Sequence, residues 1–570
     1  MEAPPRRTPL RIGIDLGTTF SCVAALDERG RTVIVRNRSG SLTTPSVVWF
    51  DGHEAVVGAC AYAYERRSPG YLNAFVKRDT GKPPSIPPEL YDRDDAPPTA
   101  PYARDGYDWG VPGMQALVLR QLRADALALF RETGQLAPDT PDDEAQVEAV
   151  VTVPAYFRDI EREQTHQAAE IAGLRVRALI NEPTAAALAY QVARSDTKRV
   201  FVFDLGGGTF DVTILDVFAD GRAEVLASEG NPHLGGKDWD EVILRYLSDE
   251  WTLATGARPD EAQRLELRLL ATEAKIALST AETAEVALPL PDGSEALRTL
   301  HRAPAADANP ILLDLDDDTF FFETRCTNLL TQVRAICQMA LDEAQLPGSG
   351  AQSWSYIDEI VMVGGSCRMP MIPALLEAMA GGYHTVERNP RGFDFDTAVA
   401  TGAALYCQRA DRVRDVSPGT YGIKIKDRAR DRYVVKHLIH KNDPLPITVE
   451  RAFYAGAKAA LELYQGAFTS LADCILRGRI ELNNPEGPIR VLLHMGPDGT
   501  LSAACVLPDG ERRTVTIRNE FFDDRTAELV ERVRGVRLIP CAAPSRPDGS
   551  SDDPDGGDDP DGHTTLAIDA

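Results

Sequence analysis

The sequence has no long apolar run. No stretch of its 570 residues approaches the ~18 consecutive apolar residues of a transmembrane helix, which argues against an integral membrane protein. The first fifteen residues, MEAPPRRTPLRIGID, contain no apolar segment like that of a secretory signal peptide. We therefore expect a cytoplasmic protein with no membrane partner.

Positive charge is also scarce. Lys and Arg number 61 against 86 Asp and Glu, which gives a net charge of −25 at pH 7. Phosphate backbones and anionic membranes attract basic surfaces, so the composition argues against a nucleic-acid partner. A nucleotide site remains compatible with this charge, because a small site can be locally positive or can include a metal ion.

The cysteines form no recognisable pattern. They are odd in number, scattered, and never spaced C-x-x-C, so the sequence predicts neither a zinc site nor a disulfide framework, and it favours a reduced compartment. The nine are Cys22, Cys60, Cys326, Cys337, Cys367, Cys407, Cys474, Cys505 and Cys541.

The chain does have enough apolar mass for several cores. Its residues are 43% hydrophobic and 26% charged, and at ~150 residues per domain a prior of about three or four domains follows. Over residues 10–408, apolar strand-like runs alternate with amphipathic helical stretches, which is typical of an α/β domain. Residues 78–110, rich in Pro, Asp and Tyr, are expected to form a surface excursion.

The pattern changes after residue 408. Residues 409–416 are charged and are predicted to be a linker. Residues 417–540 contain short apolar runs (RIELNN, IRVLLHM, LSAACVL and RTVTIRN) separated by NNPEGP, GPDGT and PDG. Evenly spaced strands with Pro-Asp-Gly turns predict an antiparallel β domain.

The end of the chain allows little further structure. Residues 521–540 can form one short helix, in which Glu528 and Arg532 are four residues apart and make a favourable helical pair. Residues 541–570 contain eight Asp and almost no large apolar side chains. We expect this tail, like the leader over residues 1–9, to be disordered.

One motif occurs twice. Residues 11–19 read RIGIDLGTT, and residues 200–209 read VFVFDLGGGT. In each copy an apolar strand ends in Asp-Leu-Gly and is followed by small or hydroxyl residues. Asp15 and Asp204 are 189 residues apart, a separation that suits two similar subdomains presenting the same turn.

The repeated turn has the chemistry of a phosphate site. Each strand delivers a carboxylate, which would face hydrated Mg²⁺. The glycines allow close backbone approach, and N–H groups and hydroxyls then point at anionic oxygens. A single copy could equally be an ordinary tight turn, but two matched copies favour a triphosphate clamp. The residues in these loops are Gly17, Thr18, Thr19, Gly206, Gly207, Gly208 and Thr209.

Two further segments suit the same site. Gly364, Gly365 and Ser366 follow an apolar run and could lie against an adenosine, although strand–Gly-Gly turns are common. Asn181-Glu182-Pro183 reads as a helix start with Pro at the first helical position. Glu182 is therefore a candidate second carboxylate on the metal side.

Taken together, these segments resemble the 70-kDa heat-shock (DnaK-type) chaperone family. The matching segments are residues 12–24 (IGIDLGTTFSCVA), 151–157 (VTVPAYF), 181–190 (NEPTAAALAY), 203–211 (FDLGGGTFD), 233–236 (HLGG) and 361–368 (VMVGGSCR). Their order and spacing match from about residue 10 to 408. The resemblance implies an actin-like ATPase of two lobes around a nucleotide cleft, followed by a peptide-binding β-sandwich.

The resemblance also implies roles for single residues. Lys77 would orient the attacking water and contact the γ-phosphate, while Glu182, Asp204, Thr209 and Asp211 would complete the catalytic set. The metal side would comprise Asp15, Asp204 and Glu182. The nucleotide contacts would be Gly17, Thr18, Thr19, Gly206, Gly207, Gly208, Thr209, Lys275, Ser279, Gly364, Gly365, Ser366, Arg368 and Asp396. Pro154, Tyr156 and Arg162 would relay the nucleotide state to the β domain.

This chain departs from the family pattern in several places. Lys237 replaces an acid beside HLGG, and Thr272 and Ile276 replace polar residues of the adenine clamp, which predicts weaker nucleotide binding. The leucine-rich linker is replaced by charged residues 409–416, whose docking would bury charge at a cost of kilocalories. Because the long helical lid is also missing or reduced to residues 521–540, we expect ATP to shift peptide affinity by less than about tenfold, or ~1.4 kcal/mol.

Three functions are consistent with these features. The first is an ATP-dependent chaperone that hydrolyses ATP with Mg²⁺, with K⁺ as a further candidate ion, and holds extended apolar peptides. The family implies a J-domain co-chaperone and a nucleotide exchange factor as its partners and a role in the stress response. The second is a nucleotide-dependent scaffold that binds one dedicated protein. The third, an actin-like sugar kinase, shares the Asp-Leu-Gly loops but not NEPTAAALAY or the β domain.

Overall fold

The computed structural model describes most of the chain. The described residues are 10–82, 101–104, 107–191, 197–220, 222–304, 319–346, 350–382, 394–409, 413–427, 432–455, 458–483, 487–497, 499–515 and 526–541. The predicted leader (1–9), the tail after Cys541 and most of the predicted excursion (83–100 and 105–106) lie outside them. No helix in the described part of the chain is long and apolar enough to cross a membrane.

The first lobe, lobe I, is built on a mixed sheet of strand order β11-β10-β1-β2-β3, with β4 paired to β2. β1 runs parallel to β10 and antiparallel to β2. Helices α2 and α3 contact each other and contribute to one core with β1 and β10. The elements are β1 (Leu10–Asp15), β2 (Phe20–Leu26), β3 (Thr32–Ile34), β4 (Thr44–Pro45), β10 (Val147–Val153), β11 (Arg175–Asn181), α2 (Gly110–Glu132) and α3 (Asp159–Ile171).

The second lobe, lobe II, repeats this plan in the order β17-β12-β13-β14-β18. β12 is parallel to β17 and antiparallel to β13, as β1 is to β10 and β2. The duplication predicted from the two Asp-Leu-Gly motifs is therefore confirmed, because Asp15 ends β1 and Asp204 is the last residue but one of the equivalent strand β12. The strands are β12 (Lys198–Leu205), β13 (Phe210–Val217), β14 (Ala223–Asn231), β17 (Glu359–Val363) and β18 (Val413–Arg414).

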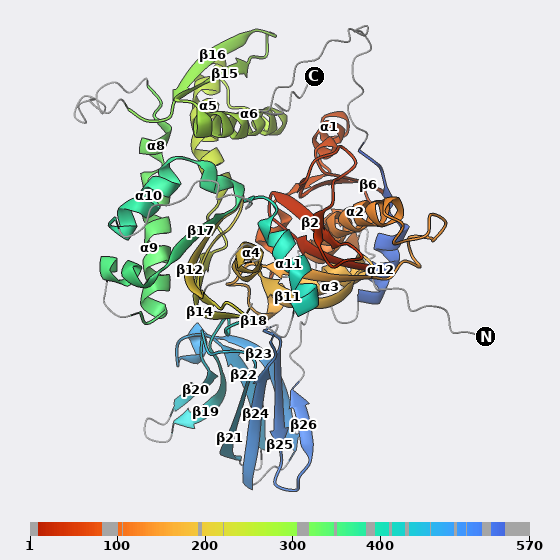
Figure 1. Cartoon of the computed structure of the whole chain (residues 1–570), viewed down its shortest axis with the longest axis vertical. Helices are drawn as coiled ribbons and strands as arrows, with labels where there is room; N and C mark the ends of the chain where they lie inside the picture. Colours follow the sequence, from red (N-terminus) through yellow and green to blue (C-terminus); the bar gives the residue numbers. More distant parts are fainter. Residues whose placement is uncertain are drawn as a thin grey trace.

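Two helices lie between the sheets of the lobes, α4 (Glu182–Gln191) and α11 (Ala398–Arg409) (Figure 1). Their buried residues share one core with strands of both lobes. The helices touch closely at Gly402, where a Cβ would lie 1.7 Å from the carbonyl oxygen of Ala185. Only glycine permits this contact, so the sequence TGAALY allows the lobes to meet.

Each lobe carries an outer subdomain. On lobe I, α1 (Cys60–Arg67) covers β5 (Val47–Phe50), β6 (Glu54–Val57) and β7 (Leu72–Ala74), which pair as β6-β5-β7. A short hairpin, β8 (Ala103–Arg104) and β9 (Tyr107–Asp108), also precedes α2. Lobe II adds α5 (Gly236–Thr255), α6 (Glu261–Thr280), β15 (Thr283–Pro289), β16 (Glu295–His301), α8 (Phe322–Arg325), α9 (Thr327–Glu343) and α10 (Met371–Ala380).

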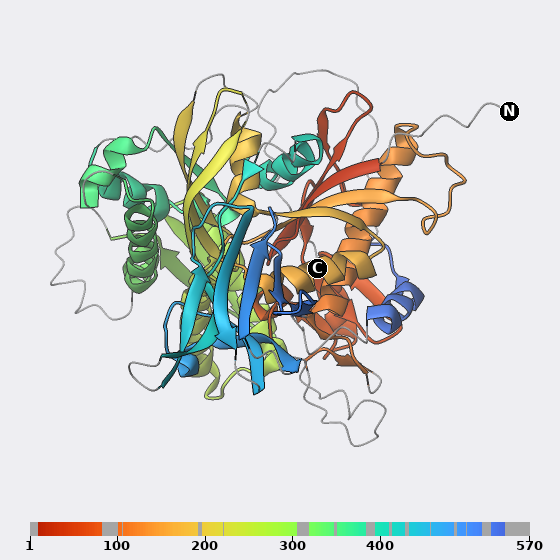
Figure 2. The same cartoon turned by 90° about the horizontal axis from the view of Figure 1, so that it is seen from below.

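Residues 421–515 form two four-stranded antiparallel sheets that share one core, and we call them the two-sheet domain. The sheet orders are β20-β19-β22-β23 and β21-β24-β25-β26. Figure 1 shows this domain beneath the junction of the lobes, and in Figure 2, seen from below, it lies in front of them. Its strands are β19 (Tyr421–Asp427), β20 (Arg432–Ile439), β21 (Ile447–Ala455), β22 (Lys458–Gln465), β23 (Ile475–Asn483), β24 (Gly487–Met495), β25 (Leu501–Val506) and β26 (Arg512–Val515).

The predicted linker does not behave as expected. Val413 and Arg414 form β18, which pairs with Ala223 and Glu224 of β14. The expectation that charge would oppose docking is wrong for the described part of the linker, where Arg414 lies 3.8 Å from Glu224 and Asp415 has a hydrogen-bond partner. The buried carboxylate of Asp415 accepts a hydrogen bond from Nδ2 of Asn181 over 2.7 Å.

The end of the described chain also differs from expectation. The predicted helix exists as α12 (Thr526–Gly535), and Arg532 and Glu528 form the predicted pair at 2.9 Å. However, α12 packs on α2 and α3 of lobe I rather than on the two-sheet domain (Figure 1). The expectation that no cysteines pair is wrong as well, because Cys60 and Cys541 form a disulfide.

Candidate functional site

A buried lysine and four acidic side chains come together where the two lobes meet. Asp15 ends β1, Asp204 lies near the end of β12, and Asp211 lies opposite Asp204 on β13. Lys77, on a short 3₁₀ helix (Val76–Asp79), forms a buried ion pair with Glu182 at the start of α4. The sequence predicted all five of these residues, and the structure gathers them.

The electrostatics of this cluster favour an added cation. Burial, followed by the negative charge of Glu182, raises the pKa of Asp15 to about 7. The same two causes raise the pKa values of Asp204 and Asp211 well above the ordinary aspartate value, while Lys77 opposes the rise. One ammonium does not balance the acidic groups, so a divalent cation nearby would restore their charged forms.

The cluster is not, however, a complete metal cage. Among the residues that the structure describes, no three acidic, histidine or cysteine side chains converge closely enough to hold a metal ion directly. Mg²⁺ usually keeps several of its waters and takes one or two carboxylates together with phosphate oxygens. The arrangement therefore fits a hydrated Mg²⁺ brought in with a nucleotide, rather than an ion held by Asp15, Asp204 and Glu182 alone.

The two glycine loops meet face to face. A Cβ on Gly207 would lie 1.9 Å from Oγ1 of Thr19, and a Cβ on Gly208 would lie 2.2 Å from Cγ2 of Thr18. The loops can approach this closely only without those side chains. The loops that the repeat predicted on equivalent strands therefore lie directly opposite each other.

Several buried polar atoms around these loops have no hydrogen-bond partner. They are Oγ1 of Thr18, Oγ1 of Thr19, the phenolic oxygen of Tyr156 and Oδ2 of Asp211. A buried polar group without a partner costs about 1–3 kcal/mol, so a cluster of them indicates a place for a ligand. Hydroxyl donors beside an acidic cluster suit a polyphosphate that carries Mg²⁺.

The proposed adenosine contacts lie on lobe II. Gly364 has φ +85° and would place a Cβ 2.4 Å from the carbonyl oxygen of Leu205, so this turn requires glycine. The hydroxyl of Ser366 donates to the carbonyl oxygen of Gly206 over 2.9 Å. Arg368 and Asp396 form a two-pronged ion pair, with both bonds at 2.9 Å.

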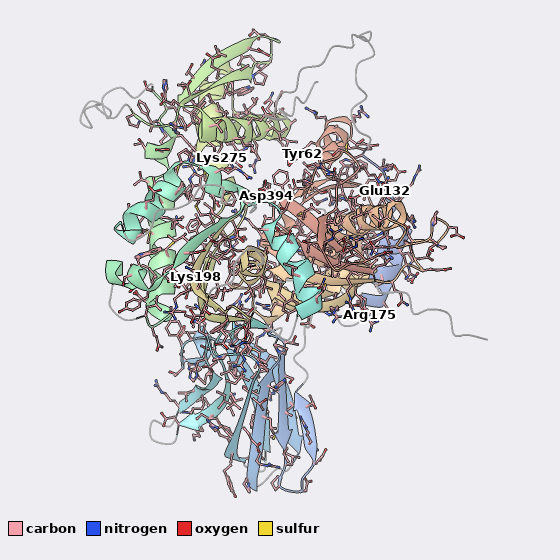
Figure 3. All side chains as sticks on the ribbon, viewed as in Figure 1. Tyr62, Glu132, Arg175, Lys198, Lys275 and Asp394 are labelled. Atoms are coloured by element: carbon pink, nitrogen blue, oxygen red, sulfur yellow. A yellow bond between two sulfur atoms is a disulfide. The ribbon has the colours of Figure 1, made fainter. Side chains whose placement is uncertain are left out.

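The predicted adenine-clamp residues on α6, Lys275 and Ser279, are already hydrogen-bonded to other groups of the protein. Lys275 pairs with Asp240 at 2.7 Å and also donates to the carbonyl oxygen of Gly236. It lies on the side of α6 that faces α1 (Figure 3). Ser279 donates its hydroxyl to the carbonyl oxygen of Lys275, one turn back on the helix. Ile276, one of the departures from the family pattern, is largely exposed.

Lys237 makes a contact that the sequence did not predict. Its Nζ lies 4.2 Å from the centre of the Phe75 ring. Phe75 directly precedes the short 3₁₀ helix that carries Lys77. Burial, followed by the charges of Arg78 and Arg268, lowers the pKa of Lys237. The basic substitution thus joins lobe II to lobe I through a cation–π contact.

Arg78 was missed by the sequence reasoning. Its Nε donates to the carbonyl oxygen of Gly208 over 2.8 Å, and its Nη2 pairs with Asp238 at 2.6 Å. It therefore bridges the lobes beside the phosphate loops. Its position directly after Lys77 in AFVKRD could have identified it as a residue of the same site.

The predicted relay forms a continuous path. The backbone N–H of Ala155, next to Pro154, donates to Oδ1 of Asp211 over 3.1 Å. Nη2 of Arg162 donates to Oδ1 of Asn181, and Nδ2 of the same asparagine donates to Oδ2 of Asp415 in the linker. The segment between Pro154 and Arg162 thus connects the acidic cluster to the docked linker.

The duplicated sheets, the facing loops and the acidic cluster with its lysine define a two-lobed ATPase of actin-like fold. The Hsp70 protein family model matches residues 11–486. The chain is 31% identical over 530 residues to the chaperone protein DnaK of Ureaplasma urealyticum, which covers 89% of this chain and 78% of that relative. It is 33% identical over 542 residues to the chaperone protein DnaK of Deinococcus radiodurans, which covers 90% and 80%.

The chain therefore belongs to the Hsp70 family, and it is an ATP-dependent chaperone of the DnaK type. This finding excludes the sugar kinase that shared its phosphate-loop motifs.

Proposed function

We propose that ATP with Mg²⁺ binds between the glycine loops and is hydrolysed beside Lys77. The supporting observation is the buried Lys77–Glu182 pair amid Asp15, Asp204 and Asp211. Mg²⁺ would supply charge neutralisation for the phosphates. Lys77 would hold the attacking water and Thr209 the γ-phosphate, so that catalysis rests on positioning and electrostatics.

The nucleotide itself would be held by both lobes. Thr18 and Thr19 would donate their unpartnered hydroxyls to phosphate oxygens, and the backbone of Gly206 and Gly207 would approach the same phosphates. Lys275, Ser279, Arg368 and Asp396 would contact the nucleoside, with K⁺ as an additional ion near the phosphates. Calorimetric titration of ATP with Mg²⁺ and with EDTA tests this. Equal affinity in both would contradict a metal-assisted site.

The two-sheet domain would serve as the substrate-binding β-sandwich. Apolar side chains are exposed on it and suit extended apolar peptides: Tyr433, Tyr454, Phe468, Ile475 and Leu476. Titration of a fluorescent apolar peptide into the full chain tests the assignment. Saturable binding that fails in Tyr454→Asp but persists in the buried-strand variant Val491→Ile would support it.

A dedicated partner in place of general clients is the second candidate function. The observation that favours it is the position of α12, the helix that follows the two-sheet domain in the described part of the chain, which packs on lobe I rather than over that domain. A panel of unrelated apolar peptides distinguishes the two, because a chaperone binds many of them with similar affinity and a scaffold does not.

The remaining partners follow from the family. We propose a J-domain co-chaperone and a nucleotide exchange factor that act on the ATPase lobes, and a cytoplasmic location. Measuring ATP turnover with and without a J-domain protein tests the first of these. A stimulation of severalfold is expected, and unchanged turnover would contradict it.

A further inference from the structure

The last described residues form a strap across lobe I, which we define as residues 526–541. Its helix, α12, buries Leu529 and Val533 in the core that α2 and α3 share. Nε2 of Gln167 on α3 donates to the hydroxyl of Thr526 over 2.5 Å. Nη1 of Arg120 on α2 donates to the carbonyl oxygen of Val536 over 3.1 Å. The strap is thus a packed part of lobe I.

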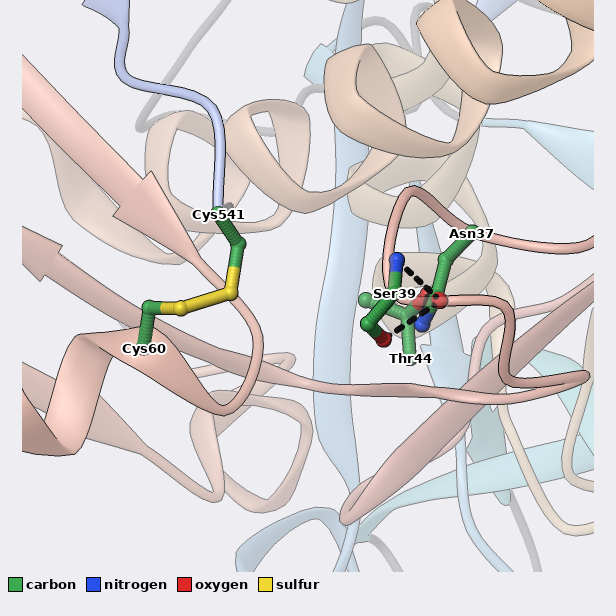
Figure 4. The surroundings of a disulfide bond; sticks show 5 residues. All are labelled: Asn37, Ser39, Thr44, Cys60 and Cys541. Carbon is green, nitrogen blue, oxygen red and sulfur yellow. Dashed lines mark hydrogen bonds between the residues drawn. A yellow bond between two sulfur atoms is a disulfide. The ribbon is translucent and has the colours of Figure 1, made fainter. Parts of the chain in front are cut away.

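Beyond the helix, the strap joins a sheet. β27 (Arg537–Leu538) pairs in parallel with β6 and extends the sheet to the order β27-β6-β5-β7. The N–H of Arg537 donates to the carbonyl oxygen of His53, and that of Ile539 to the carbonyl oxygen of Ala55, both over 2.9 Å. Two residues later, Cys541 is bonded to Cys60 at the start of α1 (Figure 4).

This arrangement fixes a segment of the chain on either side of the two-sheet domain, although residues 516–525, between the domain and the strap, lie outside the described part. At its N-terminal side, β18 is paired with β14 of lobe II. At its C-terminal side, the strap is fixed to lobe I, and the disulfide bridges a sequence separation of 481 residues. While the disulfide holds the strap in place, the two-sheet domain can move from lobe I no farther than residues 516–525 can reach, at most about 3.3–3.6 Å per residue.

We propose that Cys60 and Cys541 form a redox latch that holds the strap on lobe I and so limits how far the two-sheet domain can move while the bond is intact. A thiolate of a dithiol reductant would attack one of the two sulfurs and displace the other as a thiolate, which takes up a proton. The reductant's second thiol would then cleave the mixed disulfide. The products are two protein thiols and one oxidised reductant.

The accessibility of the two sulfurs fits this role. Cys60 and Cys541 are both partly exposed, so a small dithiol can reach them. Of the cysteines outside the bond, Cys22, Cys326, Cys337, Cys367, Cys407 and Cys505 are buried, and Cys474 is partly exposed. The other seven cysteines are free thiols, so a dithiol reductant acts only on the Cys60–Cys541 bond, and Cys474, a partly exposed free thiol, provides the matched control.

The experiment compares the full chain before and after treatment with dithiothreitol by hydrogen–deuterium exchange and by mass spectrometry of alkylated thiols. We expect two additional alkylated thiols, at Cys60 and Cys541, and at least about tenfold faster exchange in α12 and β27 after reduction, because the tethered segment can then open locally. Exchange in β24, inside the two-sheet domain, should not change.

Variants separate the latch from a general effect of reduction. Cys60→Ser and Cys541→Ser should each show the fast exchange without dithiothreitol and no further response to it, while Cys474→Ser should respond as the parent chain does. With ADP bound, β18 should exchange faster in the reduced chain than in the oxidised chain. Fully free thiols before reduction, or equal exchange of the strap in both states, would overturn the proposal. The thiol and strap measurements require neither nucleotide nor peptide, so they are independent of the proposed function, and only the β18 measurement depends on bound ADP.

Discussion

Arg477 of the two-sheet domain and Asp159 of lobe I form a buried ion pair that joins the two domains. Nε of Arg477, on β23, donates to Oδ2 of Asp159, the first residue of α3, over 2.8 Å. The side chains are only 5% and 9% exposed. Because α3 also carries Arg162, the same helix contacts the two-sheet domain and the path between the acidic cluster and the linker.

Breaking this pair should loosen the docked arrangement. Arg477→Ala would leave the carboxylate of Asp159 buried without its partner, a change that typically costs about 3–5 kcal/mol. We expect faster hydrogen exchange in β18 and a smaller effect of ATP on peptide affinity. Arg479→Ala, two residues along the same strand, removes an exposed arginine and is the control. The charge-swapped double variant Asp159→Arg/Arg477→Asp should recover part of the loss. No recovery and no change in exchange would show that the pair does not hold the domains together.

The docked linker removes one of the two grounds on which weak coupling was expected. β18 is paired and Asp415 has a partner, so the connector required for coupling is present. In the reduced chain we now expect ATP to change the affinity for an apolar peptide by more than about tenfold, or ~1.4 kcal/mol. With the disulfide intact the change should be smaller, because the strap limits movement. Peptide titrations in ATP and in ADP, in each redox state, measure both values.

Lys77→Ala should abolish most hydrolysis while leaving ATP affinity largely intact. A side chain that acts mainly in the transition state lowers kcat more than it raises KM. Single-turnover rates and calorimetric ATP affinity measure the two effects. Lys82→Ala removes a largely exposed lysine five residues away and should leave both unchanged. Near-normal hydrolysis in Lys77→Ala would refute the assignment.

Lys237→Glu, which restores an acid at this position, should weaken ATP binding more than ADP binding. A charge reversal beside the phosphate loops acts more strongly on the ligand with the greater negative charge, and the cation–π contact with Phe75, worth about 0.5–1 kcal/mol, is lost as well. Lys237→Gln removes only the positive charge and should fall between the parent and Lys237→Glu. Identical affinities for the two variants would show that the contact, and not the charge, matters. The difference should shrink in high salt.

The sequence predicted what depends on local pattern and failed where long-range packing decides. The repeated Asp-Leu-Gly turn was sufficient to place Asp15 and Asp204 on equivalent strands, because glycine and hydroxyl residues mark such turns by themselves. The docking of the charged linker depends on Asn181, more than two hundred residues away. The Cys60–Cys541 bond spans an even greater sequence separation, and no short-range spacing of cysteines could have predicted it. In the same way, the apolar face of α12 gave no indication of which domain would cover it.

The stability of lobe I should depend on pH through Asp125, a buried aspartate of α2. Burial raises its pKa to about 6, although Gln121 donates a hydrogen bond to it and Arg38 lies 4.0 Å away. Because the folded-state pKa is raised, the folded protein holds a proton between about pH 4 and 6 that the unfolded chain has lost. The free energy of unfolding should therefore fall as the pH rises through this window and then level off. Asp125→Asn keeps an oxygen for Gln121 and removes the buried charge, so it should reduce this fall, leaving the part due to Asp15, and stabilise the lobe at pH 7 by about 1–2 kcal/mol. Denaturant unfolding monitored by hydrogen exchange in α2 at pH 4.5, 6 and 7.5 measures the slope of the unfolding free energy against pH.

Asp139→Asn, at an exposed carboxylate, is the control and should leave this slope unchanged. A slope that persists unaltered in Asp125→Asn would assign the pH dependence to other groups.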